Sequence, residues 1–415
     1  MIVNTKLNPA QASGNATGNT ESNLSLANRH LKVRYDRTND FHQELKQRVD
    51  EYFQTTGLSP KDSPQMYLKT LIIFVWFAIS WGLLVFAAQT WWQVTLLSLS
   101  LGMAMAGIGL SIQHDGNHKS YSDNTILNQV CGFGADILGV SSYLWKQQHN
   151  LLHHSYTNVC GVDHDINMGD LCRLAPQQKR YWFHRFQYIY LPVLYSLLVV
   201  AWHFYRDFKD LLLGSIGEYK ISRPKGKDLV LVILGKLIFF ALAFGIPLHF
   251  HATWQVIGIY LGASAIAGLW LSFVFQTAHC MPEAEFVSLP EDDQPLVNNW
   301  AVHQLETTVD FAPHNALLTW YIGGLNYQVE HHLFPGICHV HYPAIAPIVQ
   351  ATCAEYGVKY NVLPSFTAAI KSHIHWLWLM GREDSEQLSV NSEQLSVISE
   401  QLSVGWISDS LTYAV

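Results

Sequence analysis

The chain is poor in charge and lacks the cysteine patterns that mark disulfide or zinc proteins. Only 14% of its 415 residues are Asp, Glu, Lys or Arg, and the net charge of −7 gives no basis for binding nucleic acid. Its six cysteines show no Cys-x-x-Cys spacing, so we expect reduced thiols instead of disulfides or a zinc site. A His-Glu-x-x-His run is also absent, which leaves zinc-dependent hydrolysis without its usual motif. The polar residues 1–60 contain no apolar core of a cleavable signal peptide.

In place of charge, the sequence has four long apolar runs. They cover residues 71–88, 94–112, 229–248 and 254–275. Lys236 is the only charged residue inside them. Because about 20 apolar residues span a bilayer, each run predicts a transmembrane helix. The links after the first and third runs are short, so we expect an all-α integral membrane protein whose four transmembrane helices form two hairpins.

Basic residues orient these hairpins. Eight Lys and Arg residues between positions 29 and 69 precede the first run, and six between 206 and 227 precede the third, whereas the two short turns carry none. By the positive-inside rule, both ends of the chain and its central region are predicted to face the cytoplasm. Trp91, Trp92 and Trp254 lie next to the turns and predict an aromatic belt at the opposite interface.

Three histidine clusters lie beside the apolar runs, all on the predicted cytoplasmic side. They are His114 to His118 (HDGNH), His149 to His154 (HNLLHH) and Gln328 to His332 (QVEHH). At 3.6 residues per turn, helices would place His114 with His118, His149 with His153, and Gln328 with His331 and His332 on shared faces. For a single pair, a solvated face or a hydrogen-bonded core histidine is the alternative. Seven histidines exceed the roughly four ligands that one zinc ion needs, so we predict two iron ions in a cytoplasmic helical cap.

Other polar residues are candidates for the same site. His279, at the end of the fourth run, is a possible eighth histidine ligand, and an interfacial histidine facing water is the alternative. Gln328 would bind metal through its carbonyl or hold a water molecule. Asp115, Asp163 and Asp165 would orient imidazoles, or are ordinary solvated acids. The predicted metal set is His114, His118, His149, His153, His154, His279, Gln328, His331 and His332.

The membrane domain is predicted to cover residues 67–380. A polar and partly disordered tail precedes it at 1–66, and a second tail follows at 381–415. The second tail repeats a Ser-Glu-Gln-Leu-Ser-Val heptad whose Leu and Val fall two positions apart, which favours a disordered tail over a coiled coil. Segments 126–144 and 188–205 are apolar but interrupted by Gly, Asp or Pro. We expect interfacial or buried helices there, because counting one of them as a span would separate the histidine clusters.

The three clusters and their spacing resemble the membrane fatty acid desaturases, from about residue 70 to residue 365. The family pattern is His-x3-4-His, then His-x2-3-His-His, then a third box of the same kind. Gln in place of the first histidine of that third box marks the front-end desaturases, and this chain has Gln328 there. Residues 154–158 and 300–311 also look like that group. The resemblance implies a diiron centre, O2 as co-substrate and a new cis double bond between an existing one and the carboxyl end of the chain.

Within the family, the chain is most similar to cyanobacterial delta-6 acyl-lipid desaturases, because the His-Pro-Gly-Gly motif of a fused cytochrome b5 is absent. This implies linoleoyl or alpha-linolenoyl chains of membrane lipids as substrate, in a thylakoid or plasma membrane. It also implies reduced ferredoxin, or cytochrome b5, as a separate electron donor. Lys146, Lys179, Arg180 and Arg185 would receive an acidic donor or face lipid.

Several alternatives to delta-6 chemistry stay open. Delta-5 or delta-8 sphingolipid desaturation and lipid hydroxylation share the histidine boxes. A histidine-rich metal transporter is disfavoured, because the four runs hold almost no polar groups near their middle. The position of the new double bond must be set by an apolar tunnel, and we expect Trp145, Gln304 and Thr307 near its bend.

Overall fold

The computed structural model describes residues 35, 40–289, 296 and 299–382. The predicted heptad tail lies outside these residues, as does most of the polar segment before residue 40. The described part is mostly helical. Its only paired strands are two residues long: β1 (Ser215–Ile216) with β2 (Tyr219–Lys220), antiparallel, and β3 (Asp310–Phe311) with β4 (Val362–Leu363), parallel.

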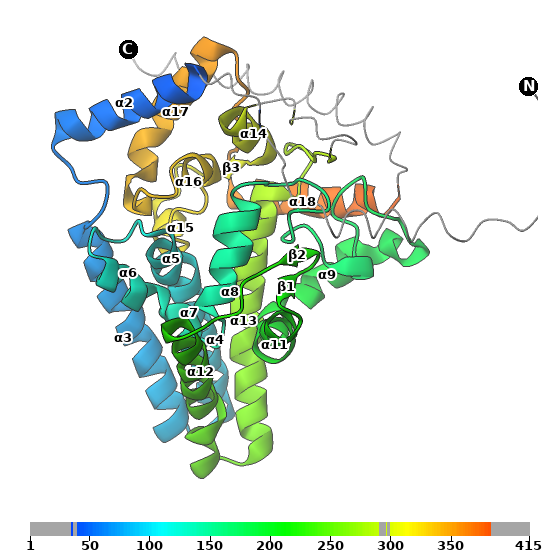
Figure 1. Cartoon of the computed structure of the whole chain (residues 1–415). Coiled ribbons are helices and arrows are strands. Elements are labelled where there is room, and N and C mark those ends of the chain that lie inside the picture. The colour runs from blue at the N-terminus through cyan, green and yellow to red at the C-terminus, as the bar shows by residue number, and fades with distance from the viewer. Residues whose placement is uncertain (1–34, 36–39, 290–295, 297–298, 383–415) are drawn as a thin grey trace, which may run out of the picture.

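Four long apolar helices form a bundle that extends from one side of the molecule (Figure 1). They are α3 (Pro64–Phe86); α4 (Trp91–Gly107), continued by the π-helical η1 (Ile108–Gln113) and α5 (His114–His118); α12 (Lys227–Phe240), continued by η6 (Ala241–Gly245) and η7 (Pro247–His249); and α13 (Thr253–His279). By length and composition, each is long and apolar enough to cross a membrane, which confirms the four predicted helices. The second and fourth helices extend further than predicted, because the polar residues after 112 and 275 continue them to His118 and His279.

The bundle has a simple order of packing. Helix α4 contacts both α3 and α13, whereas α12 contacts mainly the short helix α7 (Gly134–Ile137), and its continuations η6 and η7 contact α13. The outward faces are apolar and exposed, as on α3 at Leu71 and Val75 and on α12 at Val230 and Leu237. Such faces suit a hydrocarbon environment better than water.

The two ambiguous segments form short helices. Residues 125–146 contain α6 (Thr125–Gly132), α7 and α8 (Ser142–Lys146), and none of them has the length of a span. The following apolar stretch contains η4 (Trp182–Phe186), α9 (Gln187–Tyr195), α10 (Leu198–Ala201), η5 (Trp202–Arg206) and α11 (Asp207–Leu213). It bends by 70° and reaches the length of a fifth span only if both halves are counted as one helix.

A layer of helices covers the histidine end of the bundle (Figure 1). It consists of α2 (Asp40–Thr56), η2 (Gln147–His153), η3 (Gly169–Leu171), α14 (Trp300–Thr307), α15 (Ala316–Tyr321), α16 (Gln328–Leu333), η8 (His339–His341), α17 (Tyr342–Tyr356) and α18 (Phe366–Met380).

Composition predicts a polar tail over residues 40–56, but the structure has the amphipathic helix α2 there. Its buried residues recur every four positions at Phe41, Leu45, Val49 and Phe53, which makes one apolar stripe. This stripe joins the apolar cluster that contains Val329 and residues of α17. Helix α2 therefore braces α16, the helix that carries the third histidine cluster.

Candidate metal centre

The first cluster lies on α5, at the end of the second long helix. The π-helical turn η1 precedes it, and Lys119, with φ 60°, ends it. Gly116 permits close packing of α5 against α6, because a Cβ there would lie 2.5 Å from the backbone nitrogen of Gly132. The rings of His114 and His118 lie side by side, with 4.7 Å between their centroids.

The second cluster differs from the predicted α-helix. Residues 147–153 form a π-helical turn, and the backbone N–H of His154 donates to the carbonyl of His149, five residues earlier. The wider turn brings His149, His153 and His154 to the same side, whereas an α-helix would have aligned only the first two. No spacing rule in the sequence distinguishes this turn from an α-helix, although π turns are common at functional sites.

The third cluster lies on α16, which is fully buried. Asp310 from β3 caps this helix by accepting the backbone N–H of Val329 at 2.9 Å. The Tyr360 hydroxyl donates to Asp310 and also contacts Glu330. Burial raises the pKa of Asp310 to about 6, and hydrogen bonds from Tyr360 and α16 oppose the rise. Sequence reasoning missed this cap, because Asp310 lies 18 positions before the helix and matches no capping motif.

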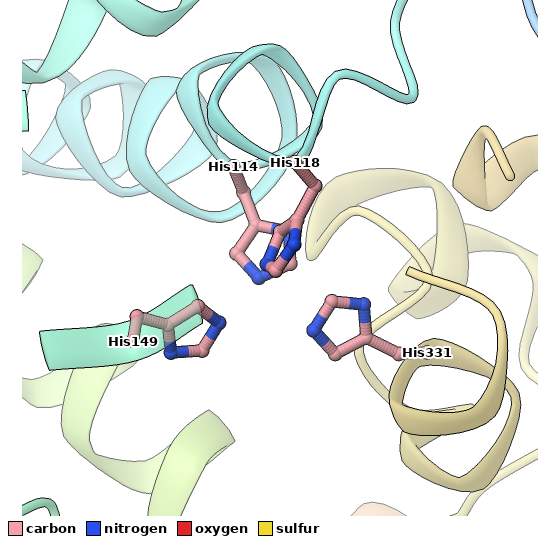
Figure 2. A group of neighbouring side chains, drawn as sticks. All are labelled: His114, His118, His149 and His331. Carbon is pink, nitrogen blue, oxygen red and sulfur yellow. The ribbon is translucent and has the colours of Figure 1, made fainter. Parts of the chain in front are cut away.

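The three clusters and His279 converge on one cage. One ligand nitrogen from each of His114, His118, His149 and His331 lies within 4.8 Å of the others, and these four side chains point toward a common space (Figure 2). His153, His279 and His332 form a second group, in which the ligand nitrogens also lie within 4.8 Å of one another. His154 lies between the groups, because its ring centroid is 4.6 Å from that of His118 and 4.3 Å from that of His332.

The cage has the unsatisfied nitrogens expected of metal ligands. Buried Nε2 atoms without a hydrogen-bond partner belong to His114, His118, His279, His331 and His332. Buried polar atoms are nearly always paired, so five such nitrogens facing one space call for a cation. His149 and His154 face each other with 3.2 Å between their Nε2 atoms, which requires a proton or a cation between two lone pairs. The side-chain oxygen of Gln328 is also buried without a partner, and Gln328 shares a face of α16 with His332.

Hydrogen bonds at the opposite nitrogens fix three of the rings. Nδ1 of His153 donates to Asp163 at 3.0 Å, that of His332 to the Gln304 side-chain oxygen at 2.8 Å, and that of His279 to the Thr307 carbonyl at 3.2 Å. A proton held at Nδ1 leaves the Nε2 lone pair free for a metal. Gln304 and Thr307, which we predicted to lie along a tunnel, therefore hold imidazoles instead.

The electrostatics of the cage favour neutral imidazole. Burial, followed by repulsion from neighbouring histidines, lowers the pKa of His149, His154, His331 and His332 well below the ordinary value. The pKa of His153 is raised instead, because the attraction of Asp163 and Asp165 outweighs burial. Neutral imidazole is the form that binds iron or zinc.

The three predicted aspartates have different surroundings. Asp163 is buried and contacts His153 directly. The carboxylate of Asp115 bonds Nδ1 of His339, which lies outside the cage, at 2.8 Å, and it is 4.0 Å from His114 of the cage. Asp165 lies 3.6 Å from His153, but about a third of its side chain is exposed (32%).

An apolar cavity adjoins the cage. Trp145 and Phe275 line it, and the ring of each contacts His149, at centroid distances of 4.3 Å and 6.1 Å. Trp145, which we predicted near the bend of an apolar tunnel, lines this cavity. A second apolar cavity lies further along the bundle.

A histidine cage at the end of an apolar helix bundle, with an apolar cavity beside it, is typical of membrane oxidoreductases that act on lipid chains. The chain belongs to the fatty acid desaturase family, whose family model matches residues 89–364. It is therefore an oxidoreductase of lipid metabolism.

Three relatives illustrate how far the similarity extends. An sn-1 linoleoyl-lipid 6-desaturase of Arthrospira platensis is 38% identical over 83% of this chain and 94% of its own length. A protein of the same name from Synechocystis sp. is 36% identical over 85% of this chain and 98% of its own length. An acyl-lipid (8-3)-desaturase of Physcomitrium patens is 38% identical, over 82% of this chain and 72% of its own length.

Proposed function

We propose that this chain is a front-end, delta-6 acyl-lipid desaturase, which inserts a cis double bond at carbon 6 of linoleoyl or alpha-linolenoyl chains in membrane lipids. The observation that carries the proposal is the convergence of three histidine clusters and His279 beside an apolar cavity. The names of the Arthrospira and Synechocystis relatives, which this chain matches over nearly their whole length, support the carbon-6 position.

Two iron ions would be held by the two histidine groups. The first has His114, His118, His149 and His331, and the second has His153, His279 and His332, with His154 between them and Gln328 as a further oxygen ligand or water holder. Iron bound there supplies the activation of O2 that removal of hydrogen from an unactivated methylene requires. The reaction balances when two hydrogens leave adjacent carbons and O2 becomes two water molecules, with two electrons and two protons from outside.

The side chains around the cage would position the reactants. Asp163, Gln304 and the Thr307 carbonyl keep the imidazoles in one orientation. Trp145 and Phe275 line the cavity where it meets His149 of the cage, and they would exclude water from the acyl chain there. No polar group marks the target carbon, so the depth of the cavity and the site of the lipid head group together determine which carbon reacts.

The proposed topology is two transmembrane hairpins, α3 with α4 and α12 with α13, under a cytoplasmic cap. Two observations support this topology. The four helices lie side by side in one bundle (Figure 1), and both turns lack Lys and Arg. Trp91 and Trp254 are 81% and 74% exposed beside those turns, as an interfacial belt requires. We place the protein in a cyanobacterial thylakoid or plasma membrane.

The electron donor is proposed to be a separate acidic protein, reduced ferredoxin or cytochrome b5. Lys146 is exposed one residue from Trp145, so a donor that docks there would lie close to the cage. Lys179, Arg180 and Arg185 are the other basic residues proposed to receive the donor.

Expression in a desaturase-free host fed linoleate tests the function. The proposal expects gamma-linolenate in the membrane lipids, and no product after His331→Ala. A new double bond at another carbon, or a hydroxylated chain, would contradict it. The Physcomitrium relative, equally identical at 38%, makes an (8-3) specificity the second candidate, so a chain with a double bond at carbon 8 is fed in parallel.

A further inference from the structure

The two apolar cavities are neighbours, and two side chains separate them. The smaller one, beside the cage, and the larger one, further along the bundle, both have Met105 from α4 and Leu138 from the α7 end among their lining residues. Beside them, the Tyr260 hydroxyl on the far side bonds Nδ1 of His203 on the near side at 2.8 Å. The two cavities therefore meet at these side chains, and we take them together as one apolar passage with a wall across it.

The positions along α13 give the passage a direction and a depth. Phe275, next to the cage, and Ala267 line the near cavity, and Ser264 and Val256 line the far one. At 1.5 Å per residue, the near cavity extends about 12 Å from the level of Phe275, and the whole passage about 28 Å. Standard single bonds advance an extended chain by about 1.25 Å per carbon, so the near cavity holds roughly ten carbons and the whole passage roughly twenty-two.

We infer that Met105 and Leu138 form a stop that sets how long an acyl chain can be on the methyl side of the new double bond. This inference rests on the proposed function, because it takes the passage as the acyl site. With carbon 6 at the cage, a linoleoyl chain has twelve carbons beyond it, and its two cis bonds shorten that part below the roughly 15 Å of a saturated chain. Its methyl end therefore extends just to the wall, whereas the wall blocks a chain that is two carbons longer.

The flexible Met105 is the better of the two side chains to remove. Its side chain is unbranched, so truncation opens the wall without changing the backbone of α4. The far cavity already lies behind it. Met105→Ala therefore joins two existing spaces, and a longer chain can extend toward Ser264.

Membranes of a host fed eighteen- and twenty-carbon substrates in equal amounts give the test. Met105→Ala is expected to raise the ratio of twenty- to eighteen-carbon product about tenfold, the effect of one or two methylenes in an apolar pocket. Adding Ser264→Leu to Met105→Ala fills the far cavity and should return the ratio to the wild-type value. Met103→Ala is the matched control, because Met103 lies on the same helix but lines neither cavity. Its product ratio should equal that of the wild type.

The outcomes separate the stop from the function itself. An active Met105→Ala enzyme with an unchanged ratio overturns the stop and leaves the proposed function standing. A wild-type enzyme that desaturates neither substrate overturns the function. If Met105→Ala fails to accumulate in the membrane, Leu138→Ala provides the same opening from the other side of the wall, and an unchanged ratio there also contradicts the inference.

Discussion

Asp163 and Asp165 lie two positions apart on one loop, yet the structure gives them unequal roles. Asp163 has a fully buried side chain and accepts three N–H groups: Nδ1 of His153 at 3.0 Å and the backbone nitrogens of Asn158 and Asp165, each at 2.9 Å. We therefore predict that Asp163→Asn, which keeps the shape and removes the charge, weakens iron binding. Asp165→Asn should do so far less.

The size of the effect follows from the hydrogen bond to His153. A bond to a charged group contributes about 1.5–3 kcal/mol, and a neutral one about 1 kcal/mol, so the loss is about 0.5–2 kcal/mol, with a middle value of about 1.3 kcal/mol. That difference corresponds to roughly tenfold weaker binding, at the lower end of the roughly 10–100-fold that such partners of metal ligands usually contribute. Asp165 is about a third exposed (32%) and 3.6 Å from the same nitrogen, so its removal should change affinity by no more than about threefold.

Iron content of the purified variants, measured against increasing chelator, gives the comparison directly. Thermal unfolding of each variant serves as the control for folding. The reasoning is refuted if Asp165→Asn loses as much iron as Asp163→Asn. That result would make Asp165 a ligand of the group that it forms with His149 and His153.

Three further predictions concern the cage and its support. Gln304→Ala removes the acceptor for His332 and should lower desaturation roughly 10–100-fold; product yield per folded protein checks this, and an unchanged yield would contradict it. Lys236→Met leaves Asp207, its partner at 2.7 Å, buried and unpaired, so unfolding should become easier by about 3–5 kcal/mol, and adding Asp207→Leu should recover most of that. Burial lowers the pKa of His303 to about 4, although the Thr157 carbonyl opposes the shift. Only the unfolded chain then binds this proton below pH about 6.5, so stability should fall by about 1.4 kcal/mol per unit as the pH drops toward about 4. In His303→Gln, which keeps the donor to Thr157, the melting temperature should fall less with pH, and equal slopes would count against the assignment.

The sequence alone was sufficient to predict the four apolar helices, because almost uncharged apolar runs of this length are seldom anything other than membrane-spanning helices. It also indicated that the histidine clusters lie on one side, since both hairpin turns lack basic residues. His279 could be predicted as a member of the cage from its place at the end of α13 alone. These are properties of composition and order along the chain.

The supporting contacts of the cage could not be predicted in the same way. The π turn at 147–153 depends on packing, and the sequence HNLLHH fits an α-helix equally well. The bonds from Gln304 to His332 and from Asp310 to α16 join segments without a fixed spacing. The composition of residues 40–56 is mostly polar, because only one residue in four is buried, and composition alone therefore did not predict helix α2.

The iron content of the purified protein tests whether the two histidine groups form a diiron centre. We expect two irons per chain, with loss of both iron and desaturation in His331→Ala and in His153→Ala, one from each histidine group. His373→Gln is the matched control, because His373 is buried and bonds Tyr195 and the Cys280 carbonyl but belongs to neither histidine group, and it should keep both irons. One zinc ion per chain in a fully active enzyme, or an unchanged iron content in His331→Ala, would contradict the account.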